Sequence, residues 1–573
     1  MSNKKRLMTY LKPMRKSLIM AMIFALLFVV AQIAQPFLLG KAIDAVGFSE
    51  RDKYYIYTFV ALGLAIGGIV FAYLFEVIVM NMSQKVIRRM RNDVYRKINS
   101  ISVKDFDKKA HGDLALLEIR DMENIAAGLF AVFKTLIQGI FTIIVTIILM
   151  VMLHWFLAIG VIILSPLSMF MAMIVSGFSN KHYKKQGQLQ AEVSSLTLET
   201  LNNIDVVQSL NYEEASTERF DEANKALKKE GRVAQFSASW VNPSTRLVNN
   251  TIYAVIGAVG VYLLSRSDPF IFITMSIGRL SSFLSYTNQY SKPFNEISNV
   301  AAEYENAKAS LRRINEFLNL EDDVNNGDAL INDIESIEFK NMSFSYDENQ
   351  KLIENLNLTI KKGQKVAIVG PTGAGKTTLI NLLMRFYDPI DGDIRFNDKS
   401  YLQVNKSSLR TSIGMVLQDT WIFTGTIMDN IRYFRQDASD EEVKEAAKKA
   451  HVDILIDTLP DGYMTRVSNK SGLSEGQRQM IAIARVMLLN PQLVILDEAT
   501  SNIDTRSEKL ITDAFDQMMK EKTSIVIAHR LSTIEGADII IVMKDGAVVE
   551  TGNHKELMKK QGFYYSLYSS QYK

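Results

Sequence analysis

The sequence predicts an α-helical membrane domain of six spans followed by a soluble α/β domain built on a parallel sheet. Long apolar stretches are crowded into the first half of the chain, whereas short apolar runs alternate with helical patterns in the second half. A chain of 573 residues is also too long for a single hydrophobic core. Together these observations require at least two domains of different kinds.

Composition excludes several classes of function. The formal net charge of +3 is small, which argues against a general nucleic-acid binder. The chain has no cysteine, so disulfides, zinc–cysteine sites and cysteine nucleophiles are excluded.

Six apolar stretches in the first half are long enough to cross a bilayer, which takes about 20 residues. Buried helices of a soluble core would not repeat this length so often. The first stretch has no small-residue cleavage site and further spans follow it, so we interpret it as a retained anchor rather than a signal peptide. The stretches cover residues 18–43, 54–80, 129–153, 155–178, 247–265 and 269–290.

The distribution of basic residues predicts the orientation of these spans. The tail before the first span carries six Lys and Arg residues and no acidic one. The long loops near 81–128 and 180–244 are also rich in Lys and Arg, and they read as helices that continue the spans. Because basic segments stay in the cytoplasm, we expect both termini there, in a multi-pass protein of a bacterial cell (plasma) membrane.

Arg279 is the clearest charge inside a predicted span. An ionisable group at membrane depth usually faces a wet cavity or a partner. Two interpretations stay open: Arg279 pairs or reaches toward the interface for structural reasons, or it lines a substrate path.

A composition shift marks the domain boundary. The segment from residue 318 is acidic, rich in Asn and without periodicity, as expected of a linker. We therefore expect a membrane domain at 1–317, a linker at 318–333 and a second domain at 334–573.

Short apolar runs in the second domain predict strands buried on both faces, as in a parallel sheet. Ligands of such sheets bind at the carboxyl ends of the strands, and a polar motif follows each run. The runs are KVAIVG, SIGMVLQD, QLVILDEA and SIVIAHR.

The segment GPTGAGKTT, directly after KVAIVG, fits a phosphate-binding loop. Its glycines let backbone N–H groups surround phosphates, and the helix that follows adds a favourable field. Lys376 would reach the β- and γ-phosphate oxygens, and Thr377 would ligate Mg²⁺. The predicted nucleotide-binding residues here are Gly370, Pro371, Thr372, Gly373, Ala374, Gly375, Lys376, Thr377 and Thr378.

The run LVILDEA ends in two carboxylates. Asp497 is the expected Mg²⁺ partner, and Glu498 would polarise the attacking water as general base. The alternative is an exposed acidic pair that begins a turn, which the phosphate loop disfavours.

Three further residues are candidates because of their positions. Gln418 and His529 follow strands, so Gln418 would reach the metal or the water and His529 the γ-phosphate. Tyr346 precedes the phosphate loop and would stack on the adenine. A lone His or a strand aromatic is otherwise more often structural.

These motifs, together with LSEGQRQ at 473–479 and SNID at 501–504, resemble an ABC-type ATPase domain in order and spacing. The six spans ahead of them resemble the membrane domain of an ABC exporter half-transporter of the multidrug and lipid-exporting kind. Kinases, GTPases and helicases share the phosphate loop but lack LSEGQ before the LDE strand. The resemblance covers nearly the whole chain and implies an α-helical six-span membrane domain followed by an α/β P-loop ABC ATPase domain.

The resemblance implies that two ATPase domains pack head to tail, each closing over the ATP of the other. Ser474, Gly476 and Gln477 would then touch the γ-phosphate held by a second chain, so the working unit is two half-transporter chains. Glu475 stands where the family usually has glycine, and TRVSNKSG lacks the usual glutamate and glycine pattern. For this reason we favour a heterodimer, with a homodimer as the alternative.

The resemblance also implies coupling through the long loops. Segments 104–113 and 211–220 would form short helices that dock near the Gln418 loop, where Trp421 and Phe423 offer an apolar contact.

The expected function is an ATP-driven translocase that uses ATP and Mg²⁺ to export hydrophobic or amphipathic drugs or lipids by alternating access. Glu498 would activate water, while Lys376 and His529 stabilise the transferring phosphoryl group and Gln418 assists. Alternatives are an ATP-gated channel or a regulatory subunit, and peptide is an alternative cargo. Importers of this superfamily normally keep the two domains on separate chains, which disfavours import.

Overall fold

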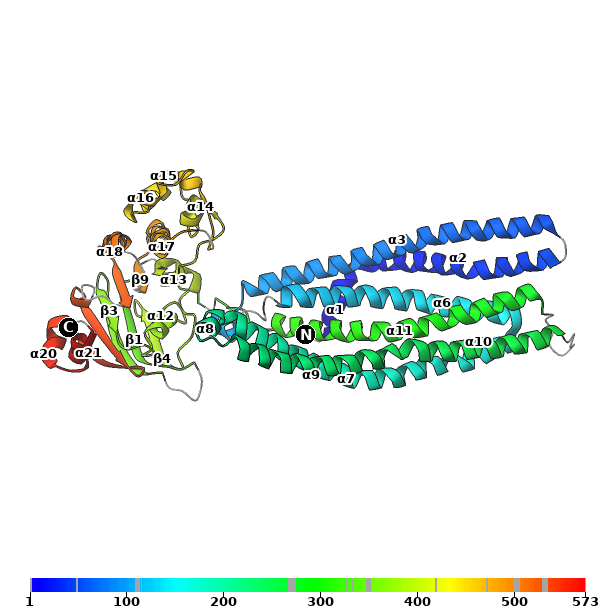
Figure 1. Ribbon diagram of the computed structural model, residues 1–573. Helices are drawn as coiled ribbons and strands as arrows, with labels where there is room; N and C mark the ends of the chain where they lie inside the picture. Colours follow the sequence, from blue (N-terminus) through cyan, green and yellow to red (C-terminus); the bar gives the residue numbers. More distant parts are fainter. Residues whose placement is uncertain are drawn as a thin grey trace. The chain divides into compact units, whose positions relative to one another are not determined.

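The structure is a computed structural model, and it describes residues 3–571 apart from 48–49, 109–113, 115, 266–274, 326, 332, 347–351, 418–419, 470–471, 498–504 and 528–533. The chain forms two compact units (Figure 1). The first unit comprises Met1–Ser100 and Lys109–Leu320, and the second comprises Ile101–Lys108 and Glu321–Lys573.

The first unit is a bundle of long helices that pack lengthwise against one another (Figure 1). The helix α2 packs on α3 and α11, and α6 packs on α11. The helices are α1 (Asn3–Leu11), α2 (Arg15–Gly47), α3 (Arg51–Ile98), α6 (Met122–Leu164), α7 (Pro166–Asn202), α8 (Ile204–Ser209), α9 (Glu213–Ser239), α10 (Val241–Ser265) and α11 (Ile277–Leu318), with a π-helical turn, η2, at Leu117–Asp121.

Four helical segments among the described residues are long and apolar enough to span a membrane. They contain five of the six predicted spans, because the 86-residue segment Leu117–Asn202 holds two of them. These two meet at His154, whose φ of −164° and ψ of 101° break the helix. The sixth predicted span starts outside the described residues, and α11 begins at Ile277 within it.

Polar contacts tie α2 to α11 near Pro36, where α2 lacks a backbone N–H. The Tyr286 hydroxyl donates to the Ile33 carbonyl oxygen at 2.9 Å, and the Ser282 hydroxyl donates to the Pro36 carbonyl oxygen at 2.8 Å. The α11 hydroxyls thus donate to two backbone carbonyl oxygens of α2 and join the two helices at this point.

The second unit contains two main sheets. One has the order β2-β1-β4-β5, with β1 (Ser336–Phe344) antiparallel to β2 (Ile353–Lys361) and β4 (Asp391–Phe396), and β4 antiparallel to β5 (Lys399–Ser400). The other has the order β12-β11-β3-β10-β9-β6 and is parallel except for β12 (Ala547–Gly552). Its remaining strands are β3 (Lys365–Val369), β6 (Ile413–Val416), β9 (Leu493–Asp497), β10 (Thr523–Ile527) and β11 (Ile539–Lys544).

The four apolar runs identified in the sequence are β3, β6, β9 and β10, so the predicted parallel sheet is confirmed. Their residues are buried because helices or the other sheet cover both faces.

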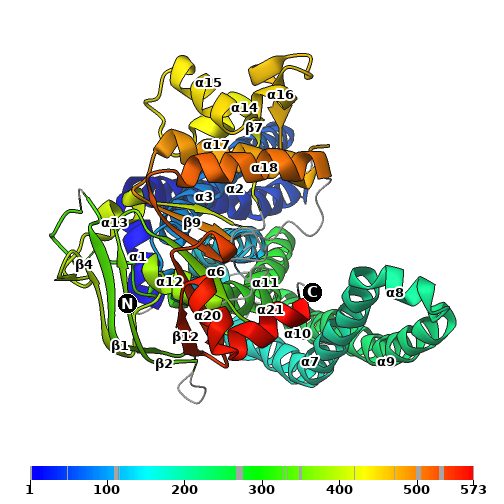
Figure 2. The ribbon, with the colours of Figure 1, turned by 90° about the vertical axis from the view of Figure 1, so that its left-hand side faces the viewer.

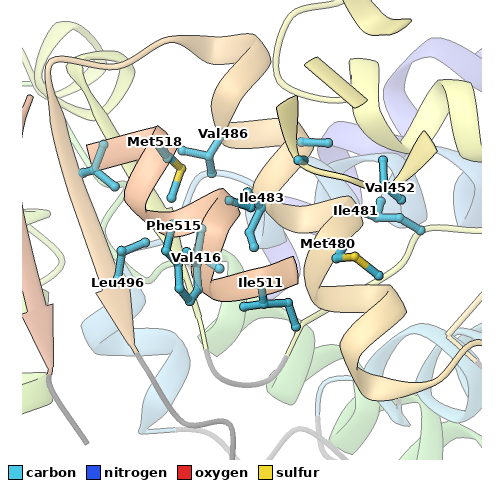
Figure 3. Close-up of a cluster of buried hydrophobic side chains, with 14 of the residues drawn as sticks. Val416, Val452, Met480, Ile481, Ile483, Val486, Leu496, Ile511, Phe515 and Met518 are labelled. Carbon is cyan, nitrogen blue, oxygen red and sulfur yellow. The ribbon is translucent and has the colours of Figure 1, made fainter. Parts of the chain in front are cut away.

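Two hydrophobic cores hold the second unit together. One lies between the antiparallel sheet, the six-stranded sheet and α12 (Lys376–Leu383). The other packs the six-stranded sheet against α17 (Glu475–Leu489) and α18 (Thr505–Met519), which lie side by side in Figure 2. In Figure 3, Leu496 of β9 and Ile483 of α17 point toward Phe515 of α18.

Shorter helices complete this unit. They are α4 (Val103–Asp107), α13 (Lys406–Ser412), α14 (Ile427–Arg432), α15 (Asp440–Lys449), α16 (Asp453–Ile456), α20 (His554–Lys560) and α21 (Phe563–Gln571).

Candidate nucleotide-binding site

The predicted phosphate loop connects the carboxyl end of β3 to the start of α12. Gly373 and Gly375 have φ of +83° and +95°, values that favour glycine. A Cβ on Gly370 would come within 2.2 Å of the Met543 carbonyl oxygen on β11. The loop therefore needs glycine at these positions to bring its backbone amides together at a helix N-terminus.

Lys376, the first residue of α12, turns back over this loop. Its ammonium group donates to the carbonyl oxygens of Gly370 at 2.6 Å and Pro371 at 3.1 Å. Burial lowers the pKa of the Lys376 ammonium group, and the Asp497 carboxylate opposes that shift. The loop thus concentrates positive charge where a phosphate would bind.

Some of the neighbouring loop residues are buried and stabilise the loop, whereas others are exposed. The Ala374 amide donates to the Pro371 carbonyl oxygen at 3.2 Å, which closes the turn. Thr378 is buried, whereas Thr372 and Thr377 are exposed. The exposed hydroxyl of Thr377 therefore lies in the first turn of α12.

The strands that carry the other motifs end beside the phosphate loop. Ile527 of β10 is paired with both Ile368 of β3 and Asp497 of β9, and Val416 of β6 is paired with Leu496. The predicted residues that follow these ends, Gln418, Glu498 and His529, lie outside the described residues. The strand register brings the carboxyl ends of β6, β9 and β10, at Val416, Asp497 and Ile527, to one edge of the sheet.

Asp497 and Thr377 fit a magnesium site by chemistry. Mg²⁺ prefers oxygen ligands and usually takes one or two carboxylates together with substrate phosphates. Asp497 ends β9, and its charge acts on Lys376 in the phosphate loop. The Thr377 hydroxyl and the Asp497 carboxylate are thus oxygen ligands of the kind that Mg²⁺ prefers.

Tyr346 is held in place by aromatic neighbours and by α12. Its ring lies edge-on to Phe344, with centroids 4.9 Å apart, and to Tyr387 at 5.0 Å. The Asn381 amide of α12 donates to its hydroxyl at 3.1 Å. Half of Tyr346 remains exposed (50%), which leaves area for stacking.

The LSEGQRQ segment begins α17 with a capping box. The Gln477 amide donates to the Ser474 hydroxyl at 3.2 Å, and the Ser474 amide donates to the Gln477 side-chain oxygen at 2.9 Å. Ser474 is exposed and Gly476 is buried. The hydroxyl hydrogen of Ser474 remains able to donate at this helix N-terminus.

Arg485, on α17, is a structural residue that the sequence reasoning missed. Only 6% exposed, it donates to the carbonyl oxygens of Asn430 and Trp421, each at 2.6 Å, and to the Asn430 side chain at 2.5 Å. Burial lowers its pKa to about 10. The available signal was an arginine within the apolar stretch MIAIARVMLL, where a solvated charge would not be expected.

The predicted contact residues after Gln418 differ in their roles. Trp421 is 57% exposed, but Phe423 stacks on Tyr433 with ring centroids 3.9 Å apart, and the Arg485 guanidinium lies 5.4 Å from its ring centroid. Phe423 therefore packs inside the second unit, and only Trp421 offers a large exposed surface.

The short helix α4 belongs to the second unit although its residues come from the first half of the chain. The Tyr387 hydroxyl donates to the Asp107 carboxylate at 2.6 Å. Since Tyr387 also packs on Tyr346, α4 is connected to the proposed adenine position through one side chain. Residues 109–113 of the predicted docking segment lie outside the described residues.

Comparison with known proteins agrees with this arrangement. Residues 18–294 match the family model of the ABC transporter transmembrane region, and residues 353–501 match that of the ABC transporter. The chain is 35% identical to an uncharacterized ABC transporter ATP-binding protein of Bacillus subtilis over 99% of this chain and 94% of that protein. It is 37% identical to a fatty acid ABC transporter ATP-binding/permease protein of Mycobacterium tuberculosis over 84% of this chain and 76% of that protein.

A solved structure matches along the whole length. It is a bacterial Atm1-family ABC exporter with ATP bound, with a TM-score of 0.83, 27% sequence identity and 98% of each chain covered. The chain therefore belongs to the ABC transporters and is an exporter half-transporter, in which one helical membrane domain is fused to one ATP-hydrolysing domain.

Proposed function

We propose that the chain, as one half of a dimer, uses ATP to export hydrophobic or amphipathic molecules from the cytoplasm or the inner leaflet by alternating access. The observation that carries this proposal is the phosphate loop at a shared edge of four parallel strands, on the same chain as a helical bundle of membrane-spanning length. Drugs and lipids are the proposed cargo, with peptide as the alternative.

ATP would be held by the loop and by the residues around it. Backbone N–H groups of the loop 370–378, apart from Pro371, and the Lys376 ammonium group would bind the phosphates, and Tyr346 would stack on the adenine. Mg²⁺, when bound, neutralises charge on the phosphate oxygens, and Thr377, Asp497 and Gln418 are the residues we propose to hold it. Glu498 would take a proton from the attacking water, and His529 would donate a hydrogen bond to the γ-phosphate.

The second chain would complete the site. Ser474 offers an exposed hydroxyl donor at the N-terminus of α17, and Gly476, which is buried in the single chain, contributes a backbone amide to the first turn of that helix. A partner that contributes the same residues would close over the ATP bound here. Glu475 stands where the family usually has glycine and places a negative charge beside this contact with phosphate. This departure from the usual signature supports a heterodimer over a homodimer.

The name of one relative supports a lipid-like cargo, because the Mycobacterium tuberculosis protein is described as a fatty acid transporter. The basic tail and the basic long loops support a cell membrane location with both termini and the ATPase domain in the cytoplasm.

Uptake by proteoliposomes tests the proposal. With ATP supplied on the ATPase side, the purified transporter should accumulate a fluorescent amphiphile against its gradient, and Glu498→Gln protein should not. An ATP-gated channel would only equalise the concentrations. That result would overturn export while leaving ATP binding intact.

A further inference from the structure

A cavity of about 780 Å³ lies between α2, α6 and α11, outside the nucleotide-binding site. Its volume is within the range of small-molecule sites, roughly 300–1,000 Å³. The residues that line it come from the C-terminal part of α2, the middle of α6 and the first turns of α11.

A close crossing of two helices builds this cavity. A Cβ on Gly278 would lie 1.9 Å from the Gly40 carbonyl oxygen, and a Cβ on Gly40 would lie 2.4 Å from the Gly278 carbonyl oxygen. The two backbones therefore touch, as small residues allow between membrane helices. Lys41 and Arg279 each follow one of these glycines, and both line the cavity.

The charges around the cavity do not cancel. Asp44 is the only acidic residue among the described residues that line it. Its carboxylate oxygens already accept hydrogen bonds from the Ser276 hydroxyl at 2.7 Å and the Gly278 amide at 2.8 Å. Two cationic side chains thus stand against one carboxylate, and an ion pair between Arg279 and Asp44 would still leave Lys41.

Lys41 is held by aromatic rings. Its ammonium group lies 4.8 Å from the ring centroid of Phe37 and 5.8 Å from that of Tyr57. Within the described part of the chain, no carboxylate forms a salt bridge with it. Lys41 lies two residues before the end of the predicted span 18–43 and is exposed, so its ammonium group is open to the membrane interface and to an anionic ligand.

The other wall of the cavity is apolar. Leu149, Met152 and Leu153 of α6 contribute it, and the methionine side chain adapts to different shapes. A ligand of this site would therefore combine a negative group, beside Lys41 and Arg279, with a hydrocarbon chain along α6.

We propose that this cavity binds the anionic head group of an amphiphile that carries an acyl chain. The head group is a carboxylate or a phosphate, and Arg279 and Lys41 bind it by charge-assisted hydrogen bonds. The inference rests on the export function and the orientation proposed above, which place this end of α2 and α11 away from the cytoplasm. It assigns Arg279 to the substrate path, one of the two interpretations that its position in the span leaves open.

Equilibrium binding to the purified full-length protein in a neutral detergent tests the site. The probes are radiolabelled oleate, oleoyl lysophosphatidate and oleyl alcohol, which share a chain and differ in the head group. The double variant Lys41→Gln/Arg279→Gln should bind the anionic probes at least about tenfold more weakly, because two charge-assisted contacts are lost. Binding of oleyl alcohol should not change.

Two further variants separate charge from fold. Lys41→Arg/Arg279→Lys keeps both charges and should retain binding of the anions. Lys134→Gln removes another lysine of the bundle, one paired with Glu76 at 2.5 Å, and should leave all three probes unaffected. Preference for oleate identifies a carboxylate as the natural head group, and preference for lysophosphatidate identifies a phosphate.

The proposal is wrong if the double Gln variant binds the anions as tightly as the wild type, if it loses oleyl alcohol to the same degree, or if the wild type binds neither anion. Binding is measured without ATP, so its failure is distinct from a failure of export. Intact anion binding without ATP-driven uptake would overturn the proposed function and leave the site in place.

Discussion

Lys376 shows how much a single residue of the site owes to its immediate surroundings in the sequence. The spacing of GPTGAGKTT places it at the first position of α12, and the glycines before it allow its ammonium group to return to the loop carbonyls. This part of the site could be predicted because the motif is local. Arg485 could not, since its partners lie 55 and 64 positions away along the chain.

Glu498 is the residue on which hydrolysis should depend most directly. Glu498→Gln keeps the size of the side chain but removes the base. We expect ATP binding near the wild-type level and hydrolysis slower by roughly 10²–10⁴-fold. Nucleotide binding and phosphate release, measured on one preparation, check this. Glu441→Gln, at an exposed position of α15, serves as the control, and normal turnover in the Glu498 variant would refute its role.

Arg485 should matter for stability. Arg485→Met leaves the Trp421 and Asn430 carbonyl oxygens without this donor, which we expect to cost about 3 kcal/mol. Thermal unfolding of the full chain, compared with Arg466→Met at an exposed position, measures the loss. Equal midpoints for the two variants would show that the buried guanidinium contributes nothing to the fold.

At the scale of elements, the sequence was informative where burial leaves a local pattern. The strands β3, β6, β9 and β10 are continuous apolar runs because both of their faces are covered. The antiparallel sheet of β1, β2 and β4 went unpredicted, as its strands mix polar and apolar residues. The assignment of α4 to the second unit depends on tertiary contacts that no periodicity encodes.

Tyr387 links α4 to the proposed adenine position. Tyr387→Phe keeps the ring against Tyr346 but removes the hydroxyl that donates to Asp107. We expect ATP affinity to change less than about twofold and transport per ATP hydrolysed to fall severalfold, since one charge-assisted hydrogen bond is lost. Parallel assays of ATPase activity and uptake check this.

The matched control is Tyr401→Phe, whose hydroxyl donates to Asp388 at 3.0 Å within the same unit. An equal fall in transport per ATP hydrolysed in both variants would mean that the hydrogen bond between Tyr387 and α4 has no specific role in coupling.

Near the start of the second unit's main segment, the Asp323 carboxylate accepts hydrogen bonds from Lys406 at 2.5 Å and from Arg410 at 3.0 Å. Burial raises the pKa of the Asp323 carboxyl, but the bonds from Lys406 and Arg410 outweigh this and hold it below the ordinary 3.8. Because the pKa of Asp323 is lower in the folded than in the unfolded chain, its ionised carboxylate stabilises the fold at pH values above the pKa of the unfolded chain. This contribution is lost as the pH falls through the pKa of the folded chain.

Asp323→Asn should therefore cost about 1–2 kcal/mol at neutral pH. The variant should also show a smaller fall in thermal midpoint than the wild type when the pH drops below about 4. Identical pH profiles for the two proteins would remove Asp323 from this dependence.

At the scale of the whole molecule, one chain carries one phosphate loop and one LSEGQRQ segment, so the proposed closed site needs a second chain. Glu498→Gln protein expressed alone, with ATP and Mg²⁺ in detergent, should remain near the 64.7 kDa chain mass if the partner is a different half-transporter. Native mass spectrometry decides this. A species of twice that mass would establish a homodimer and refute the heterodimer that we favour.

The membership of residues 101–108 in the second unit bears on how such proteins can be recombined. The chain enters or leaves this unit after Ser100, Lys108 and Leu320, so no single cut separates the two units. A fragment that starts at Glu321 would lack the acceptor of the Tyr387 hydroxyl. A chimera that exchanges the ATPase part with that of a relative must therefore include the eight residues 101–108 from the same relative. Otherwise these residues and the ATPase domain that they pack on would come from two different proteins.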